Sequence, residues 1–172
     1  ELGYGRIKCK IEPGWTVEPI SRIRREFPQM RVMADANSAF TLDDVEMLRS
    51  LDELELLMIE QPLAYDDIAD HARLQAQVKT PICLDESIHG VADAQAMIDL
   101  KAGRIINMKV ARVGGLTNAI RIHDMARGAG IAMWSGGMLE TGVGRSVNIQ
   151  LSTLPNFTLP GDLSATDRYF CL

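Results

Sequence analysis

The chain has 172 residues, of which 47% are hydrophobic and 24% are charged, so it is long enough for one sizeable core and too short for two. Its 18 basic and 23 acidic residues give a formal net charge of −5 without a basic stripe, which argues against a nucleic acid as partner. No apolar run approaches the roughly 20 residues that a bilayer crossing needs, so we expect no membrane partner either.

The three cysteines do not support a disulfide framework. Cys9 and Cys83 lie inside short apolar runs, and Cys171 lies at the extreme end of the chain. An odd number of cysteines placed in this way is typical of reduced thiols in a reducing compartment. We therefore expect a cytoplasmic protein.

Seven short apolar runs recur along the chain at intervals of about 25 residues. They cover residues 5–10, 31–35, 56–60, 81–85, 105–109, 131–134 and 157–160. Each run is short and continuous, as expected for a strand of a parallel sheet that is buried on both faces. The regular interval predicts that one strand-and-helix unit repeats along the chain.

Between these runs the apolar residues change to the three- and four-residue spacing of a helix. The predicted helices cover residues 19–27, 42–51, 66–78, 91–100, 116–129 and 142–154. Thr41 is predicted to cap the second helix, with Asp43 and Asp44 in the first turn, where the positive end of the helix dipole favours acidic groups. Strands that alternate with such helices predict right-handed crossovers and a parallel sheet.

The pattern predicts an α/β fold, a partial (β/α)8 TIM barrel of about seven βα units. A closed barrel of this type has eight strands, whereas the chain supplies seven candidate runs and begins at Glu1, a few residues before the first of them. We therefore expect residues 1–172 to form one barrel domain of a longer protein, without the first strand. The open edges of an incomplete barrel are templates for association, so we also expect a homo-oligomer.

Three of the predicted strands end on a carboxylate, namely Asp35, Glu60 and Asp85. Adjacent strands lie about 4.8 Å apart, so side chains at equivalent strand ends can converge above the barrel mouth. Three hard oxygen donors without a neighbouring Cys or His suit Mg²⁺ or Mn²⁺ better than zinc. The alternative is that these acids cap helices or face solvent, but three acids in register favour a metal site, because active sites gather at this face of such barrels.

Lysines end the predicted strands on either side of these acids. Lys10 precedes them, Lys109 follows them, and Lys8 shares the strand parity of Lys10 and therefore its side of the sheet. A nearby divalent cation and a second lysine disfavour the charged form of a lysine, which can lower its pKa and make it a general base. The alternative is that the lysines only neutralise carboxylate charge. For Lys8 the two interpretations are equally good, whereas the opposed placement of Lys10 and Lys109 favours proton transfer on two faces of one carbon.

These motifs together resemble those of the enolase superfamily. The resemblance is to the muconate-lactonizing branch, which has a Lys-x-Lys motif on one strand, and within it to the group of o-succinylbenzoate synthases and N-acylamino acid racemases. The matching segments are residues 8–15, 35–41, 59–63, 80–87, 107–109, 112–116, 134–145 and 157–162. One departure is Val110-Ala111, which stands where members of this group usually have Pro-Gly.

The resemblance implies a set of functional residues. The ligands of Mg²⁺ would be Asp35, Glu60 and Asp85. The acid/base pair would be Lys10 and Lys109, with Lys8 assisting Lys10. Support of the metal would come from Asn37 and Glu86, and contact with the substrate from Asn37, Ser135, Gly136 and Met138.

The resemblance also implies a reaction, the Mg²⁺-dependent removal of the proton α to the carboxylate of a small substrate. It implies o-succinylbenzoate synthase activity, a dehydration of the menaquinone pathway, and N-acylamino acid racemase activity at the same site. The alternatives are a dipeptide epimerase or cycloisomerase of the same superfamily and a catalytically inert barrel fragment. The α+β capping domain of the family would precede this chain.

Overall fold

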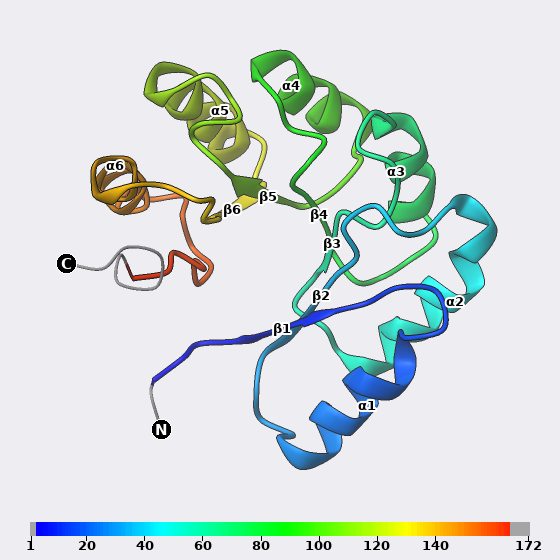
Figure 1. The fold of residues 1–172 in the computed structure, drawn as a ribbon. Helices are drawn as coiled ribbons and strands as arrows, with labels where there is room; N and C mark the ends of the chain where they lie inside the picture. The colour runs from blue at the N-terminus through cyan, green and yellow to red at the C-terminus, as the bar shows by residue number, and fades with distance from the viewer. Residues whose placement is uncertain (1–2, 166–172) are drawn as a thin grey trace.

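The computed structural model describes residues 3–165, which contain a curved sheet of six parallel strands. The strands neighbour one another in chain order, as β1 (Ile7–Lys10), β2 (Val32–Asp35), β3 (Ile59–Glu60), β4 (Ile82–Leu84), β5 (Ile105–Met108) and β6 (Ala132–Ser135). Helices surround the sheet on its outer side, so that the chain forms an open part of a barrel (Figure 1). The predicted α/β fold and partial barrel are confirmed.

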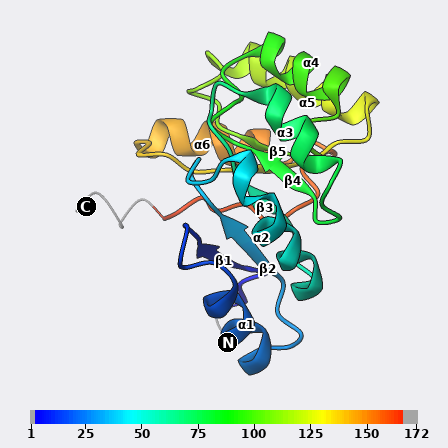
Figure 2. The ribbon, with the colours of Figure 1, turned by 90° about the vertical axis from the view of Figure 1, so that its right-hand side faces the viewer.

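Helical segments follow the strands, as the sequence predicted. They are α1 (Val17–Glu26), η1 (Leu42–Asp44), α2 (Val45–Ser50), η2 (Leu51–Leu54), α3 (Ile68–Gln75), α4 (Val91–Leu100), α5 (Leu116–Gly128) and α6 (Gly142–Leu151). The predicted cap is present, because the Asp43 amide donates to Thr41 Oγ1 (3.3 Å) and the Thr41 amide donates to Asp44 Oδ2 (2.9 Å). In a view turned by 90°, α1 and α2 lie toward one end of the sheet and α3 to α5 toward the other (Figure 2).

The seventh predicted strand does not form a regular strand. Phe157 pairs with Met133 of β6 in a single parallel bridge, and the Leu159 amide donates to Met133 O (3.3 Å). The next residue, Pro160, has no N–H and cannot continue the ladder. The sheet of the described residues therefore has six strands rather than seven, and the last segment runs beside β6 with few regular bonds.

Side chains along each strand alternate between the helix layer and the concave face of the sheet. Val32 and Ala34 of β2 belong to the core that packs against the helices, whereas Met33 between them belongs to a second cluster. The buried members of that cluster are Met33, Met58, Cys83, Ile105 and Trp134. Asp35 lies two residues after Met33, so the same alternation directs it to the concave face. Glu60 and Asp85 lie two residues after Met58 and Cys83 and are directed to that face in the same way.

The thiols of Cys9 and Cys83 are free, and Cys171 lies outside the described residues. Cys83 is completely buried and accepts a hydrogen bond from Trp134 Nε1 (3.3 Å). Over residues 3–165, none of the helices has the length and apolar character that crossing a bilayer requires.

Asp52 in η2 holds the segment that leads into β4. Its carboxylate accepts from the amides of Lys79 (2.9 Å) and Thr80 (2.8 Å) and from the Thr80 hydroxyl (2.7 Å). Partial burial opposes the charged form, but these hydrogen bonds outweigh it and lower the pKa of Asp52 below its ordinary value. The contact fixes the start of the strand whose other end carries Asp85.

Asp52→Asn should reduce the dependence of stability on acidic pH. A carboxylate whose pKa is lowered on folding stabilises the fold above its unfolded pKa, and this contribution is lost as the pH falls through the folded value. The free energy of unfolding of the wild-type chain should therefore exceed that of Asp52→Asn at about pH 7, and the difference should shrink toward about pH 3. Urea titrations followed by circular dichroism measure both, and a difference that is constant with pH would contradict this role.

Candidate active site

The three carboxylates predicted to bind a metal lie together at the carboxyl ends of neighbouring strands. Asp35 and Glu60 are register partners in β2 and β3, and Asp85 directly follows β4. All three are at most 2% exposed. Burial and the negative charges of Asp35 and Asp85 raise the pKa of Glu60 to about 8, although Lys8 and Asn107 act in the opposite direction. The acids therefore influence one another as members of one site.

Lys8 and Lys10 reach the same carboxylate from β1, as their shared strand parity predicted. Lys10 Nζ lies 2.7 Å from Asp35 Oδ2, and Lys8 Nζ lies 3.2 Å from both Asp35 Oδ2 and Glu60 Oε2. Burial disfavours the charge on Lys8, but the carboxylates of Glu60, Asp162 and Asp35 outweigh this effect and raise the pKa of Lys8. Lys8 thus lies within ion-pair distance of three carboxylates, and its assistance to Lys10 stays a prediction.

Lys109 reaches the site from the other side of the acids. Its Nζ lies 2.6 Å from Asp85 Oδ2. Lys10 and Lys109 are thus paired with the two outer acids, and Glu60 of the middle strand lies between them. Val110-Ala111, the departure from the usual Pro-Gly, does not turn Lys109 away from the site.

The three carboxylates do not form a preformed cation-binding site. Among residues 3–165, no group of three His, Cys, Asp or Glu side chains has the geometry to hold a metal ion. Asp35 and Asp85 instead direct an oxygen to a lysine. The donors nevertheless suit a hard divalent cation, because they are three buried carboxylates on adjacent strand ends. Their close placement would also let one bound cation balance several negative charges at once.

Asn37 and Glu86, predicted to support the metal, are linked to each other and to Lys10. Asn37 Nδ2 donates to Glu86 Oε1 (2.8 Å), and the Asn37 amide donates to Asp35 Oδ1 (3.2 Å). The Asn37 side-chain oxygen accepts from Lys10 Nζ. The second oxygen of Glu86 is buried and has no hydrogen-bond partner among the described residues. Asn37 therefore orients Lys10 and Asp35 together.

The other residues predicted to contact the substrate lie at the end of β6 and in the loop after it. Ser135 is buried, and its hydroxyl has no hydrogen-bond partner in the described part of the chain. Gly136 packs so closely on Asn107 that a Cβ atom there would overlap the Asn107 side chain. Met138 is 42% exposed, and its amide donates to Glu140 Oε2 (2.8 Å). Contact of Ser135, Gly136 and Met138 with a substrate stays a prediction.

Two residues of the site had no role in the sequence interpretation, although both lie in the matching segments. Asn107 Nδ2 donates to Glu60 Oε1 (2.6 Å), and the Arg112 guanidinium donates to Asp85 Oδ1. Asn107 lies two residues before Lys109 and thus on the same face of β5, so strand parity could have identified it. Arg112 lies in the turn after β5, where parity gives no direction.

Asp162 is a third residue that the sequence interpretation did not assign. Its Oδ2 lies 2.8 Å from Lys8 Nζ, and its Oδ1 accepts from the Gly137 amide (3.0 Å). It therefore connects the first strand to the loop after β6. Asp162 also lies in a matching segment, residues 157–162, but strand parity gives no direction for its side chain because that segment is not a regular strand.

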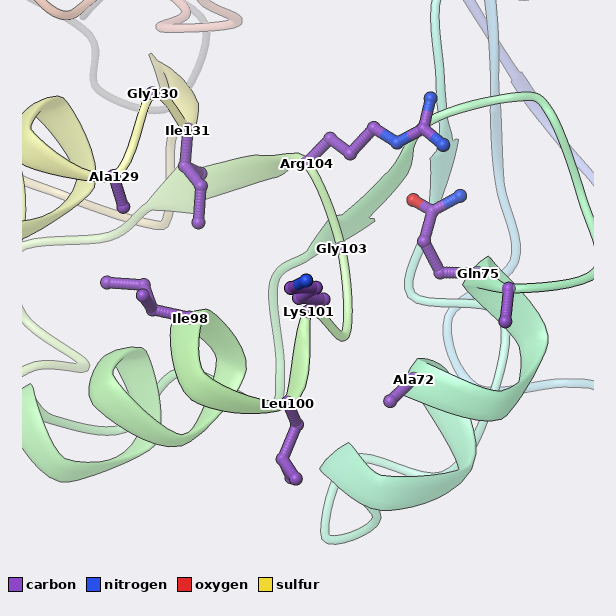
Figure 3. A pocket seen from close by; sticks show the side chains of 11 residues that line it. Ala72, Gln75, Ile98, Leu100, Lys101, Gly103, Arg104, Ala129, Gly130 and Ile131 are labelled. Carbon is purple, nitrogen blue, oxygen red and sulfur yellow. The ribbon is translucent and has the colours of Figure 1, made fainter.

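A cavity of about 650 Å³ lies at the opposite, amino-terminal end of the strands. It is lined by α3, α4 and the loops that lead into β5 and β6, including Gln75, Leu100, Lys101 and Arg104 (Figure 3). Arg104 immediately precedes β5 and Lys109 immediately follows it, so the length of the strand separates this cavity from the carboxylates. Despite its size, the cavity is not part of the candidate active site.

A curved parallel sheet with outer helices and with ionisable side chains at the carboxyl ends of its strands defines the class of βα-barrel proteins, whose active sites lie at that face. The sequence model of the family described as "Enolase C-terminal domain-like" matches residues 1–170. The chain belongs to this family. The resemblance to the enolase superfamily is thereby confirmed.

Nearly all of the chain matches parts of longer curated proteins. It is 58% identical over 168 residues to an o-succinylbenzoate synthase from Geobacillus kaustophilus, which covers 98% of this chain and 45% of that protein. It is 54% identical over 170 residues to an N-succinylamino acid racemase from Thermus thermophilus, which covers 99% of this chain and 46% of that protein. The chain therefore spans less than half the length of these relatives.

Solved structures have the same arrangement of strands and helices. A member of the enolase superfamily from Listeria innocua has a TM-score of 0.94 at 45% identity, over 99% of this chain and 46% of that chain. A muconate lactonizing enzyme from Pseudomonas fluorescens has a TM-score of 0.86 at 27% identity, over 93% of this chain and 45% of that chain. The partial barrel is thus a recurring portion of larger proteins of this superfamily.

Gly136→Ala should destabilise the chain and displace Asn107, the hydrogen-bond donor to Glu60. The added methyl group would overlap the Asn107 side chain, and overpacking of this kind lowers the free energy of unfolding by about 1–3 kcal/mol. Gly128→Ala is the matched control, because nothing lies within 4 Å of its added Cβ. Urea denaturation measures both variants, and equal stability of the two would contradict the close packing of Gly136 on Asn107.

Proposed function

We propose that this chain is the barrel portion of an enzyme that removes a proton from the carbon next to a carboxylate, as an o-succinylbenzoate synthase, an N-acylamino acid racemase, or both. The observation that carries the proposal is the placement of Lys10 and Lys109 on the two outer acids of one buried carboxylate row. Removing and returning a proton on opposite faces of one carbon requires two such groups. The names of the relatives, o-succinylbenzoate synthase and N-succinylamino acid racemase, support this reaction class.

We propose Mg²⁺ as the cofactor, with Mn²⁺ as a substitute, and Asp35, Glu60 and Asp85 as the residues that would hold it. A proton next to a carboxylate is hard to remove because the product carries a second negative charge, which the bound cation would stabilise. Asn107 keeps Glu60 in place through the bond to Oε1 (2.6 Å), and Asn37 holds Asp35 through its amide (3.2 Å).

In a racemisation, one lysine removes the α-proton and the other delivers a proton to the opposite face. Lys10 is aimed by Asp35 and Asn37, and Lys109 is aimed by Asp85. In a dehydration, Lys10 takes the proton and can return it to the departing hydroxyl, while Lys109 offers a positive charge to the growing anion. The same arrangement therefore serves both reactions on a small carboxylate substrate.

The other members of the superfamily are weaker candidates for this chain. A muconate cycloisomerase from Acinetobacter lwoffii is 34% identical over 121 residues, well below the identity of the synthase and the racemase. No contact of the described residues favours a dipeptide epimerase or a cycloisomerase. Assays with dipeptide and muconate substrates would detect these activities.

The wild-type chain should bind Mn²⁺, and Glu60→Gln should weaken this binding at least about tenfold, because a neutral amide replaces the central carboxylate. Electron paramagnetic resonance of free Mn²⁺ measures the dissociation constant. Asp52→Asn is the matched control, since it removes an acid of η2 that lies outside the site. Equal affinity of the wild type and Glu60→Gln would rule out the proposed metal site.

Lys10→Ala and Lys109→Ala should each slow α-proton exchange of N-acetylmethionine in D₂O with Mg²⁺ by at least about 100-fold. The two variants should affect opposite enantiomers, because the lysines act on opposite faces. Proton NMR of each enantiomer measures the deuterium wash-in, and Lys101→Ala in the remote cavity is the control. Loss of the same enantiomer in both variants would contradict the two-face arrangement. Metal binding by the wild type without any exchange would identify an inert barrel instead.

A further inference from the structure

Gln61 lies between two acids of the proposed metal site. It directly follows Glu60 in the chain, and its side chain is completely buried. Its Oε1 accepts from the amide of Asp85 (3.0 Å) and from the amide of Ser87 (3.1 Å). One side chain thus joins the strand end that carries Glu60 to the strand end that carries Asp85.

The side-chain amide of Gln61 uses all of its hydrogen-bonding capacity. In addition to the two bonds accepted by Oε1, Nε2 donates to Ser87 Oγ (2.7 Å) and to Leu63 O (3.2 Å). An amide has two donor hydrogens and two acceptor lone pairs, so no further bond is needed. A buried polar group with a complete set of partners is held in one position.

The backbone of Gln61 is fixed as well. Its φ is +39°, in the left-handed region that residues other than glycine seldom adopt. Its N–H donates to Cys83 O (2.8 Å), and its carbonyl accepts from the Ser38 amide (2.8 Å). Gln61 therefore connects the segments at the ends of β2, β3 and β4, the three strand ends that carry the carboxylates.

A buried histidine of α3 supports this arrangement. His71 Nε2 accepts from the Leu63 amide (3.2 Å), and Nδ1 donates to Asp67 O (2.6 Å). These two contacts fit a neutral ring with its proton on Nδ1, and burial lowers the pKa of His71 in agreement with this state. The loop of residues 61–63 is thus held from the helix side.

We propose that Gln61 is a positioning residue that sets the separation of Glu60 and Asp85 through its bond to the Asp85 amide, and thereby prepares the site for a divalent cation. The inference rests on the proposed function and identifies a residue that would position two of the metal ligands. Groups that orient metal ligands typically change the affinity for the metal by about 10- to 100-fold when they are removed. Gln61 should have an effect of this size without touching the metal.

Gln75 provides a matched control at the other end of the same strand. Its Nε2 donates to Val78 O (3.3 Å) and Thr80 O (3.2 Å), and its Oε1 accepts from the Ile82 amide (2.8 Å). It is a buried glutamine that fixes backbone groups at the start of β4, beside the remote cavity (Figure 3). Loss of its amide should destabilise the fold without moving Asp85.

The test compares Gln61→Met, Gln75→Met and the wild-type 172-residue chain. Hydrogen exchange at the Asp85 and Ser87 amides, measured by NMR without metal, reports whether these groups are held. Mn²⁺ affinity, measured by electron paramagnetic resonance, reports the effect on the site. We expect Gln61→Met to speed exchange at both amides and to weaken Mn²⁺ binding about 10- to 100-fold. Gln75→Met should leave Mn²⁺ affinity unchanged and should speed exchange more at the Ile82 amide than at the Asp85 and Ser87 amides.

The proposal would be overturned if Gln61→Met bound Mn²⁺ as tightly as the wild type does. It would also be overturned if Gln75→Met lost as much Mn²⁺ affinity as Gln61→Met. If Gln61→Met does not fold, Ser87→Ala carries the test, because it removes one partner of Gln61 and should weaken Mn²⁺ binding less than tenfold but measurably. Absence of Mn²⁺ binding by the wild type would reject the proposed metal function, and with it the role toward the cation. Amide exchange would then still decide whether Gln61 holds Asp85.

Discussion

The burial of three neighbouring carboxylates away from water is the constraint on which the rest of this site depends. Glu60 is completely buried between two other acids, and burial together with the negative charges of Asp35 and Asp85 raises its pKa to about 8. Buried charges are costly unless they are paired and hydrogen-bonded, so each acid needs its partners. The lysines of β1 and of the segment after β5, together with Asn107, supply these partners.

The short strands serve both the core and the site. Alternate side chains of a strand pack against the helices, while those between them fill the concave face and end in the charged groups. A displacement of one strand would therefore change packing and active-site geometry together. Two buried glutamines, Gln61 and Gln75, hold the two ends of β4 by bonds to backbone groups and limit such displacement.

Much of the fold could be predicted because the chain repeats one structural unit at a regular interval. The helix of residues 91–100 has the predicted bounds, and the acids and lysines lie at strand ends because the interval places them there. The seventh strand was predicted wrongly, since hydrophobic runs do not reveal that Pro160 interrupts the ladder. The roles of Gln61 and Asp162 depend on contacts between segments far apart in the chain, and a single sequence contains no distances.

The ion pair between Lys8 and Asp162 joins groups that are about 150 residues apart in the sequence. During translation the amine is made early and its carboxylate partner is made near the end of this region. Forming such a contact requires that the entropy of closing the intervening loop be overcome. The full set of charges around Lys8 is therefore present only after the ribosome has made almost all of these residues.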